Sequence, residues 1–153
     1  MDWRADRIGA AERGENPTVI TRMHSGYAVL GDTQFLPGYC VLLAVPQVTH
    51  LTDLALPDRR DFLVDMSLLG EAIERVYQPR RINYEILGNT DAYVHAHVWA
   101  RYDWEPKEYI GGPVWRYPQE TRFAPEQAFL REKHEVVRRQ LADVLTMLMK
   151  SAY

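Results

Sequence analysis

Two histidines stand two residues apart in the stretch 93–101, and their neighbours follow the same period. Five side chains share one parity: Tyr93, His95, His97, Trp99 and Arg101. The residues between them are small and apolar: Val94, Ala96, Val98 and Ala100. Because successive side chains of a strand leave opposite faces of its sheet, this period predicts a half-buried β-strand. A strand with only a structural role does not need two imidazoles, a phenol, an indole and a guanidinium on one face. We therefore interpret the stretch as an active-site strand.

Three kinds of role compete for His95 and His97. A metal site needs three or four ligands, and the sequence places no cysteine, third histidine or obvious carboxylate at a fixed spacing from this pair. A structural role, in which the rings only satisfy local hydrogen bonds, is a second alternative. We favour nucleophilic or acid–base catalysis, because neutral imidazole is a nucleophile that titrates near physiological pH and forms covalent intermediates.

The segment before this strand, Leu87-Gly88-Asn89-Thr90, has the composition of a turn. Its glycine permits a close backbone approach, and polar groups stand beside it. With the Thr90 hydroxyl and the loop amides near a reacting phosphoryl group, the histidines would form a phosphoryl or nucleotidyl transfer site.

The overall composition limits the class of protein. The chain has 153 residues, of which 46% are hydrophobic and 25% charged, which is typical of one globular domain with its own core. A net charge of −3 gives no broad cationic field, so we expect no nucleic acid polymer as a partner. A single nucleotide in a pocket needs only a few local donors and is compatible with this charge.

The single cysteine and the absence of long apolar runs bear on the compartment. Cys40 lies in an apolar run and is expected to be buried rather than catalytic. The segment 1–16 has acids and no apolar core of a secretory signal, and no run approaches the roughly 20 apolar residues of a membrane span. We therefore expect a soluble cytoplasmic protein.

The hydrophobic pattern predicts strands at 18–23, 27–31, 39–45, 82–87 and 93–102. A helix is predicted from Pro57-Asp58 to Tyr77, with one buried stripe: Phe62, Met66, Leu69, Ile73 and Val76. A final helix is predicted to begin at Pro125-Glu126-Gln127, with its apolar content from Phe129, Val136, Val137, Leu141, Leu145 and Leu148. Strands flank a helix without βαβ alternation, which favours an α+β fold with a mostly antiparallel sheet of about five strands.

One domain over 1–153 is expected. Its ends are a polar N-terminal arm at 1–16, either a short helix or mobile, and a C-terminal extension at 106–153 that carries the last helix. Within the extension, 111–118 is aromatic and rich in Gly and Pro, as in a loop that packs over something.

The motifs around the two histidines resemble the histidine-triad (HIT) superfamily, whose signature is His-φ-His-φ-His-φ-φ with φ apolar. The stretch Tyr93-Val94-His95-Ala96-His97-Val98-Trp99 matches it at six of seven places. Leu87-Gly88-Asn89-Thr90 and Arg101-Tyr102 look like the bacterial branch of diadenosine polyphosphate hydrolases. Leu36-Pro37-Gly38-Tyr39 is similar to the family's Pro-Gly-His strand, and the likeness spans about 18–105.

The resemblance implies a HIT-like α+β fold, a homodimer and specific roles. His95 would attack the α-phosphorus of a nucleotide, and His97 would contact the phosphate and assist the leaving group. Thr90 and Asn89 would donate to the phosphate, and Asp32 would lie near the ribose. No resident metal or cofactor is implied; Mg²⁺ would enter, if at all, with a polyphosphate.

Two aromatic residues depart from the family pattern. Tyr93 replaces the first histidine, so the motif is a dyad, and Tyr39 replaces the histidine of Pro-Gly-His. In the family, a main-chain carbonyl near the first position orients the nucleophile, and a backbone acceptor survives a change of side chain. We therefore expect His95 to keep its nucleophilicity, with a slower or specialised enzyme as the consequence. Tyr93 is counted with the substrate-binding residues.

Other candidates have two readings. Arg101 either touches a phosphate or is an exposed strand-end residue. Trp104 and Trp115 either stack on a base or pack, whereas packing is favoured for Trp99. His134 is expected on the solvated face of the final helix.

The leading hypothesis is a nucleotide hydrolase or transferase that cleaves a nucleoside polyphosphate, such as diadenosine tetraphosphate, through a nucleotidyl-histidine on His95. The alternatives are a non-catalytic nucleotide-binding module and a nucleoside phosphoramidate hydrolase. The last shares the same residues and differs only in its leaving group.

Overall fold

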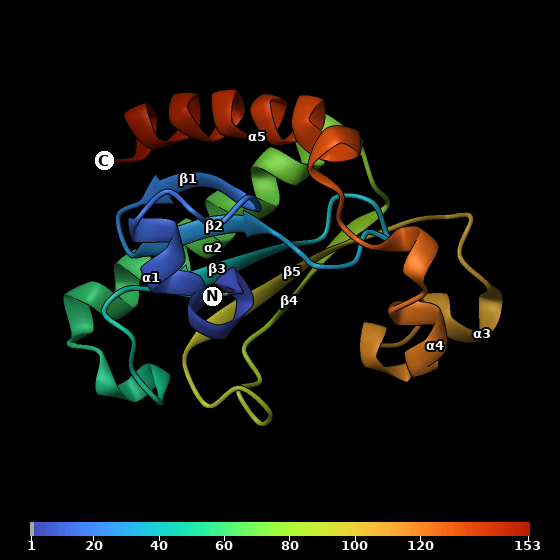
Figure 1. Cartoon of the computed structure of the whole chain (residues 1–153), viewed down its shortest axis with the longest axis horizontal. Helices are drawn as coiled ribbons and strands as arrows, with labels where there is room; N and C mark the ends of the chain where they lie inside the picture. The colour runs from blue at the N-terminus through green and yellow to red at the C-terminus, as the bar shows by residue number, and fades with distance from the viewer. Residues whose placement is uncertain (1) are drawn as a thin grey trace.

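Five antiparallel strands form one sheet in the order β1-β2-β3-β5-β4 (Figure 1). The computed structural model describes residues 2–153. The strands are β1 (Val19–Met23), β2 (Gly26–Leu30), β3 (Cys40–Ala44), β4 (Arg81–Glu85) and β5 (His95–Arg101). The predicted α+β class and the five predicted strands are confirmed, although β5 begins at His95, so Tyr93 lies just before it.

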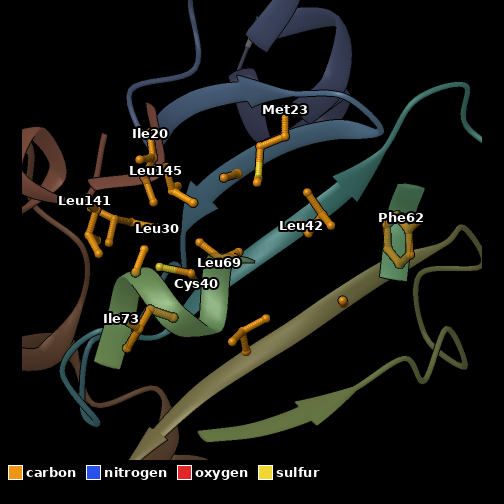
Figure 2. Close-up of a cluster of buried hydrophobic side chains, with 14 of the residues drawn as sticks. Ile20, Met23, Leu30, Cys40, Leu42, Phe62, Leu69, Ile73, Leu141 and Leu145 are labelled. Carbon is orange, nitrogen blue, oxygen red and sulfur yellow. The ribbon is translucent and has the colours of Figure 1, made fainter. Parts of the chain in front are cut away.

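Side chains of alternating parity on β3 and β5 enter two different clusters. One parity joins the main core, shown in part in Figure 2: Cys40, Leu42, Ala44, Val94, Ala96, Val98 and Ala100. The other parity faces a second cluster that contains Tyr39, Val41, Leu43 and Trp99. Burial on both faces explains why β3 is a continuous apolar run. Cys40 is fully buried, as predicted, and burial raises the pKa of its thiol.

Two long helices cover the main-core face of the sheet. Helix α2 (Leu56–Tyr77) buries Phe62, Leu69 and Ile73 of the predicted stripe, and helix α5 (Arg131–Ala152) contributes Leu141 and Leu145 (Figure 2). No helix within residues 2–153 combines the length and apolarity that a bilayer crossing requires.

Short helices make up the two ends of the chain (Figure 1). The N-terminal arm forms η1 (Trp3–Asp6) and α1 (Arg7–Glu12), whose Ile8 packs against the second cluster. Between β3 and α2 lies η2 (Leu51–Asp53). The extension contains α3 (Lys107–Ile110), η3 (Val114–Arg116), α4 (Gln119–Arg122) and η4 (Pro125–Gln127) ahead of α5.

The predicted start of the final helix is wrong. The turn at Pro125 makes only a 3-10 helix, and α5 begins at Arg131, so Phe129 precedes it. His134 is also not solvated: it is 8% exposed and stacks on Phe129, and its Nδ1 lies 3.0 Å from the amide nitrogen and 2.9 Å from the carbonyl oxygen of Leu130. The first turn of the helix therefore packs on a buried imidazole that contacts the backbone of the N-cap residue. Val136, expected among the apolar contacts, is 70% exposed.

Both interpretations of Arg101, as a phosphate ligand and as an exposed strand-end residue, are wrong. The side chain is buried, and its donors are engaged within the protein. Its side chain is 3% exposed and pairs with the fully buried side chain of Glu105, Nη2 to Oε1 at 2.9 Å. The remaining donors reach the Asn83 side chain and the carbonyls of Tyr109 and Gly112. The guanidinium thus holds the start of the extension against the sheet.

Glu105 is the centre of this attachment. It accepts from the Tyr102 amide at 2.7 Å and from the Tyr117 hydroxyl at 2.6 Å, besides Arg101. Burial acts to raise the pKa of Glu105, but Arg101, Tyr117 and the Tyr102 amide outweigh it, so the pKa lies below its ordinary value. The carboxylate is therefore charged at neutral pH, and its stabilising effect is lost as the pH falls through that lowered pKa.

We predict that Glu105→Gln lowers the free energy of unfolding at pH 7 by about 3 kcal/mol, because it leaves the buried Arg101 charge uncompensated. Urea unfolding followed by circular dichroism measures the change. Glu71→Gln is the control: its pair with Arg75 is about half exposed, and its loss should change stability by less than about 0.5 kcal/mol. Equal stability of Glu105→Gln and the wild type would contradict the assigned role.

Candidate active site

A cavity of about 190 Å³ opens on the sheet face opposite α2 and α5. Strands β2, β3 and β5 form its floor, and polar side chains gather on its wall: Arg7, Asp32, Tyr39, Asp91, Tyr93, His95 and His97. Phe123 of the extension lies at the same cavity. The site therefore draws on the N-terminal arm, the central strands and the extension.

The backbone fixes the orientation of His95. Its Nδ1 lies 2.8 Å from the carbonyl oxygen of Tyr93, and since a carbonyl only accepts, Nδ1 must carry the proton. The lone pair of the neutral ring is then on Nε2, the other nitrogen of a ring that lines the cavity. The contact is to the main chain, so this acceptor does not depend on which side chain stands at position 93.

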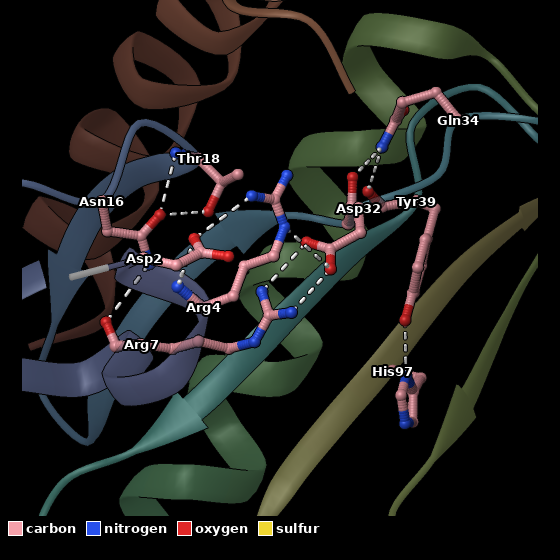
Figure 3. A network of polar contacts seen from close by, with 10 residues as sticks. Asp2, Arg4, Arg7, Asn16, Thr18, Asp32, Gln34, Tyr39 and His97 are labelled. Atoms are coloured by element: carbon pink, nitrogen blue, oxygen red, sulfur yellow. Dashed lines mark hydrogen bonds and ion pairs between the residues drawn. The ribbon is translucent and has the colours of Figure 1, made fainter. Parts of the chain in front are cut away.

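His97 is the second imidazole of the cavity, with its ring centroid 4.8 Å from that of His95. The hydroxyl of Tyr39 lies 2.6 Å from the Nδ1 of His97 (Figure 3). Burial, and next the neighbouring His95, lower the pKa of His97 to about 4, while Asp91 opposes the shift. His97 is therefore neutral at physiological pH.

The Tyr39 hydroxyl lies against the Nδ1 of that neutral ring. Burial raises the pKa of Tyr39, so the phenol keeps its proton. A protonated phenol can donate to Nδ1, and a neutral His97 that accepts at Nδ1 carries its own proton on Nε2.

Asp32 lies in the cavity in a pair with Arg7, a residue that sequence reasoning missed. The two Nη atoms of Arg7 reach the two carboxylate oxygens of Asp32 at 2.9 and 2.6 Å (Figure 3). The hydrogen bond to Asp32 raises the pKa of Arg7. Asn16 fixes the arm by donating to the Arg7 carbonyl at 3.2 Å. No pattern in the sequence predicts this pairing, because the polar arm has no periodicity that would position one guanidinium.

Asn89 and Thr90 are not among the residues that line the cavity. Both are exposed in the loop between β4 and β5, and the next residue, Asp91, lines the wall instead. Arg101 is held by Glu105 as described above. Of the seven residues expected at the site, the structure thus brings together Tyr93, His95, His97 and Asp32.

Comparison with known proteins identifies the fold. No family model matches the sequence, and no curated protein sequence matches it. Solved structures do match. A histidine triad protein from Sinorhizobium meliloti superposes with a TM-score of 0.70 at 20% identity, covering 86% of this chain and 93% of its own.

Two further structures agree with it. A histidine triad protein from Marinobacter aquaeolei gives a TM-score of 0.70 at 21% identity over 85% of this chain and 89% of its own. A diadenosine triphosphate hydrolase from Plasmodium falciparum gives 0.62 at 14% identity over 87% of this chain and 79% of its own. This chain has the histidine-triad fold.

Proposed function

We propose that the protein cleaves nucleoside 5′-phosphate derivatives at the α-phosphorus, through a nucleotidyl-histidine on His95. The observation that carries the proposal is the contact between His95 Nδ1 and the Tyr93 carbonyl, which leaves Nε2 as a nucleophile in a cavity. The structural likeness to a diadenosine triphosphate hydrolase supports a nucleotide as substrate. Among such substrates we propose a dinucleoside polyphosphate.

The first step forms a bond between His95 Nε2 and phosphorus and breaks the bond from phosphorus to the leaving oxygen, which takes the electron pair. The ring becomes cationic while it carries the nucleotide. The Tyr93 carbonyl, at 2.8 Å from Nδ1, stabilises that charge by a charge-assisted hydrogen bond. Water then attacks phosphorus, the P–N bond breaks, its electron pair returns to Nε2, and the proton of water passes to solvent.

His97 assists as a hydrogen-bond donor rather than as an acid. Its ring is neutral above about pH 4, and a neutral imidazole does not give up its last proton near pH 7. The Nε2–H stabilises negative charge that develops on a phosphoryl or leaving oxygen, as oxyanion-hole donors do. This favours leaving groups that are stable as anions, such as phosphates, over amines that need a proton. A polyphosphate is therefore preferred to a phosphoramidate.

Asp32 is proposed to accept from the ribose hydroxyls. Arg7 occupies one face of the carboxylate, but each carboxylate oxygen has a further lone pair for a hydroxyl donor. The guanidinium also offsets part of the repulsion between this carboxylate and a negatively charged substrate.

We also propose that two copies of the chain pair through the free edge of β4. The edge at β1 is occupied in part, since Arg138 of α5 donates to the Val19 carbonyl at 3.0 Å and α5 packs on β1. Strand β4 pairs only with β5 in residues 2–153, and its Tyr84 is 41% exposed. An unpaired edge is a ready template for a second strand.

Sedimentation equilibrium should therefore give twice the 17.8 kDa of one chain. The variant Tyr84→Glu should shift the protein toward the monomer, because a new carboxylate at the edge faces its copy. A mass of 17.8 kDa at all concentrations would refute the proposed dimer.

The nucleophile is tested by trapping a radiolabelled nucleotidyl adduct under alkaline quench and mapping it by mass spectrometry. We expect the label on His95 and a loss of turnover of roughly 10⁴-fold in His95→Asn, because the variant lacks the nucleophile. His97→Asn should lose about 10²-fold, the usual effect of removing one oxyanion donor. An adduct on another residue would overturn the mechanism. Binding of AMP with no cleavage of any adenylated compound would favour the non-catalytic module.

The tautomer of His97 is tested by nitrogen-15 NMR of the two imidazoles between pH 3 and 8. We expect His97 to stay neutral down to about pH 4, with its proton on Nε2. The variant Tyr39→Phe removes the hydroxyl beside Nδ1, so the tautomers should mix, whereas the pKa should stay low because burial, its main cause, remains. An unchanged tautomer in Tyr39→Phe would show that the hydroxyl does not control it.

A further inference from the structure

A second hollow of about 140 Å³ adjoins the cavity, and His97 lines both of them. It shares four residues with the cavity: Thr33, Tyr39, His97 and Phe123. Its remaining wall is largely aromatic and apolar, with Leu87, Trp99, Val114 and Trp115, and its two charged groups are Glu85 and Arg122. We call this hollow the aromatic lobe.

Two rings of the C-terminal extension face solvent at this lobe. Trp115 is 58% exposed and Phe123 is 56% exposed. Both line the lobe, so a flat ligand between them would remove a large apolar area from water. Isolated exposed aromatics are ordinary, but two beside one hollow that continues into a reaction site indicate a binding surface.

The backbone that carries these rings is fixed rather than loose. Val114, next to Trp115, is 1% exposed in the second cluster, and Tyr117 donates to Glu105 at 2.6 Å. The Arg122 guanidinium lies over the Phe123 ring at 5.5 Å from its centroid, and its Nε donates to the Tyr117 carbonyl at 3.1 Å. The lobe is therefore formed in advance of any ligand, which reduces the entropy lost on binding.

The position of the lobe relates it to the leaving group, an assignment that rests on the proposed function. With phosphorus at His95 and the nucleoside directed to Asp32, the other substituent on phosphorus must leave in a different direction. His97 borders both hollows, and the lobe beyond it contains neither His95 nor Asp32. The substituent that departs past His97 enters this lobe.

We propose that the aromatic lobe binds a planar aromatic group carried by the leaving group of the substrate. Such a ring stacks on Trp115 and Phe123, Glu85 accepts from a ring N–H, and Arg122 lies near the linking anionic oxygens. A leaving group that consists of phosphate alone has no ring to stack on the Trp115 indole, so the indole would not increase its affinity. The substrate therefore carries flat groups on both sides of the cleaved bond.

The test compares two AMP diesters that differ only in one ring, the phenyl ester and the methyl ester, each with one negative charge. Isothermal titration uses the full-length His95→Asn variant, which binds without turnover. Stacking on one aromatic side chain predicts that the phenyl ester binds roughly tenfold more tightly. Adding Trp115→Ala should abolish the difference and leave the affinity for the methyl ester unchanged, and Trp115→Phe should restore most of it.

Trp104→Ala is the matched control, because Trp104 is 62% exposed and stacks on Tyr102 outside the lobe. It should retain the phenyl preference. Equal binding of both esters, binding of neither, or the same loss in Trp104→Ala and Trp115→Ala would overturn the proposal. The adduct assay stays independent: an adduct on His95 with no ring preference refutes the lobe alone. A ring preference without an adduct supports the lobe and refutes only the catalytic step.

Discussion

The site depends on the placement of β5 inside the sheet, between β3 and β4. Hydrogen bonds on both edges fix its register, and a slip by one residue would exchange its two faces. One face puts Ala96 and Val98 into the main core, so such a slip would bury two imidazoles there without partners. The burial of Ala96 and Val98 in the main core therefore keeps His95 and His97 on the cavity side of the sheet. Few contacts of the two imidazoles themselves are needed to place them there.

Given that placement, the backbone and one phenol complete the chemistry of the two rings. The Tyr93 carbonyl determines which nitrogen of His95 carries a proton. The Tyr39 hydroxyl would do the same for His97 if it donates to Nδ1, as the proposed function requires. The acceptor for His95 is a main-chain group, so it does not depend on the side chain at position 93. With both contacts made in this way, the neighbouring rings carry opposite tautomers.

Local sequence patterns predict the strands, α2 and the polar face of β5, because the periods of 2 and 3.6 residues are visible among neighbouring residues. Such patterns do not predict the surroundings of a side chain whose partner lies elsewhere in the chain or is brought to it by a turn. The sequence suggests an exposed cation at Arg101, but in the structure Glu105 pairs with it. The sequence suggests a solvated His134, but in the structure the ring stacks on Phe129. Arg7 and Asp32 are 25 positions apart and meet only through the path of the arm. The motif position of Asn89 and Thr90 predicts them at the site, but the loop places Asp91 at the cavity instead.

The pairing of Arg7 with Asp32 ties the first helix to the chemistry of the pocket. In the proposed function, a ribose at Asp32 meets a carboxylate already paired with Arg7 of α1, so nucleoside binding and the packing of α1 act on the same two oxygens. Reciprocity of free energies then requires that a change in the packing of α1 alters ligand affinity by an equal amount. The packing of residues 2–12 and the binding of the proposed nucleotide would therefore be coupled.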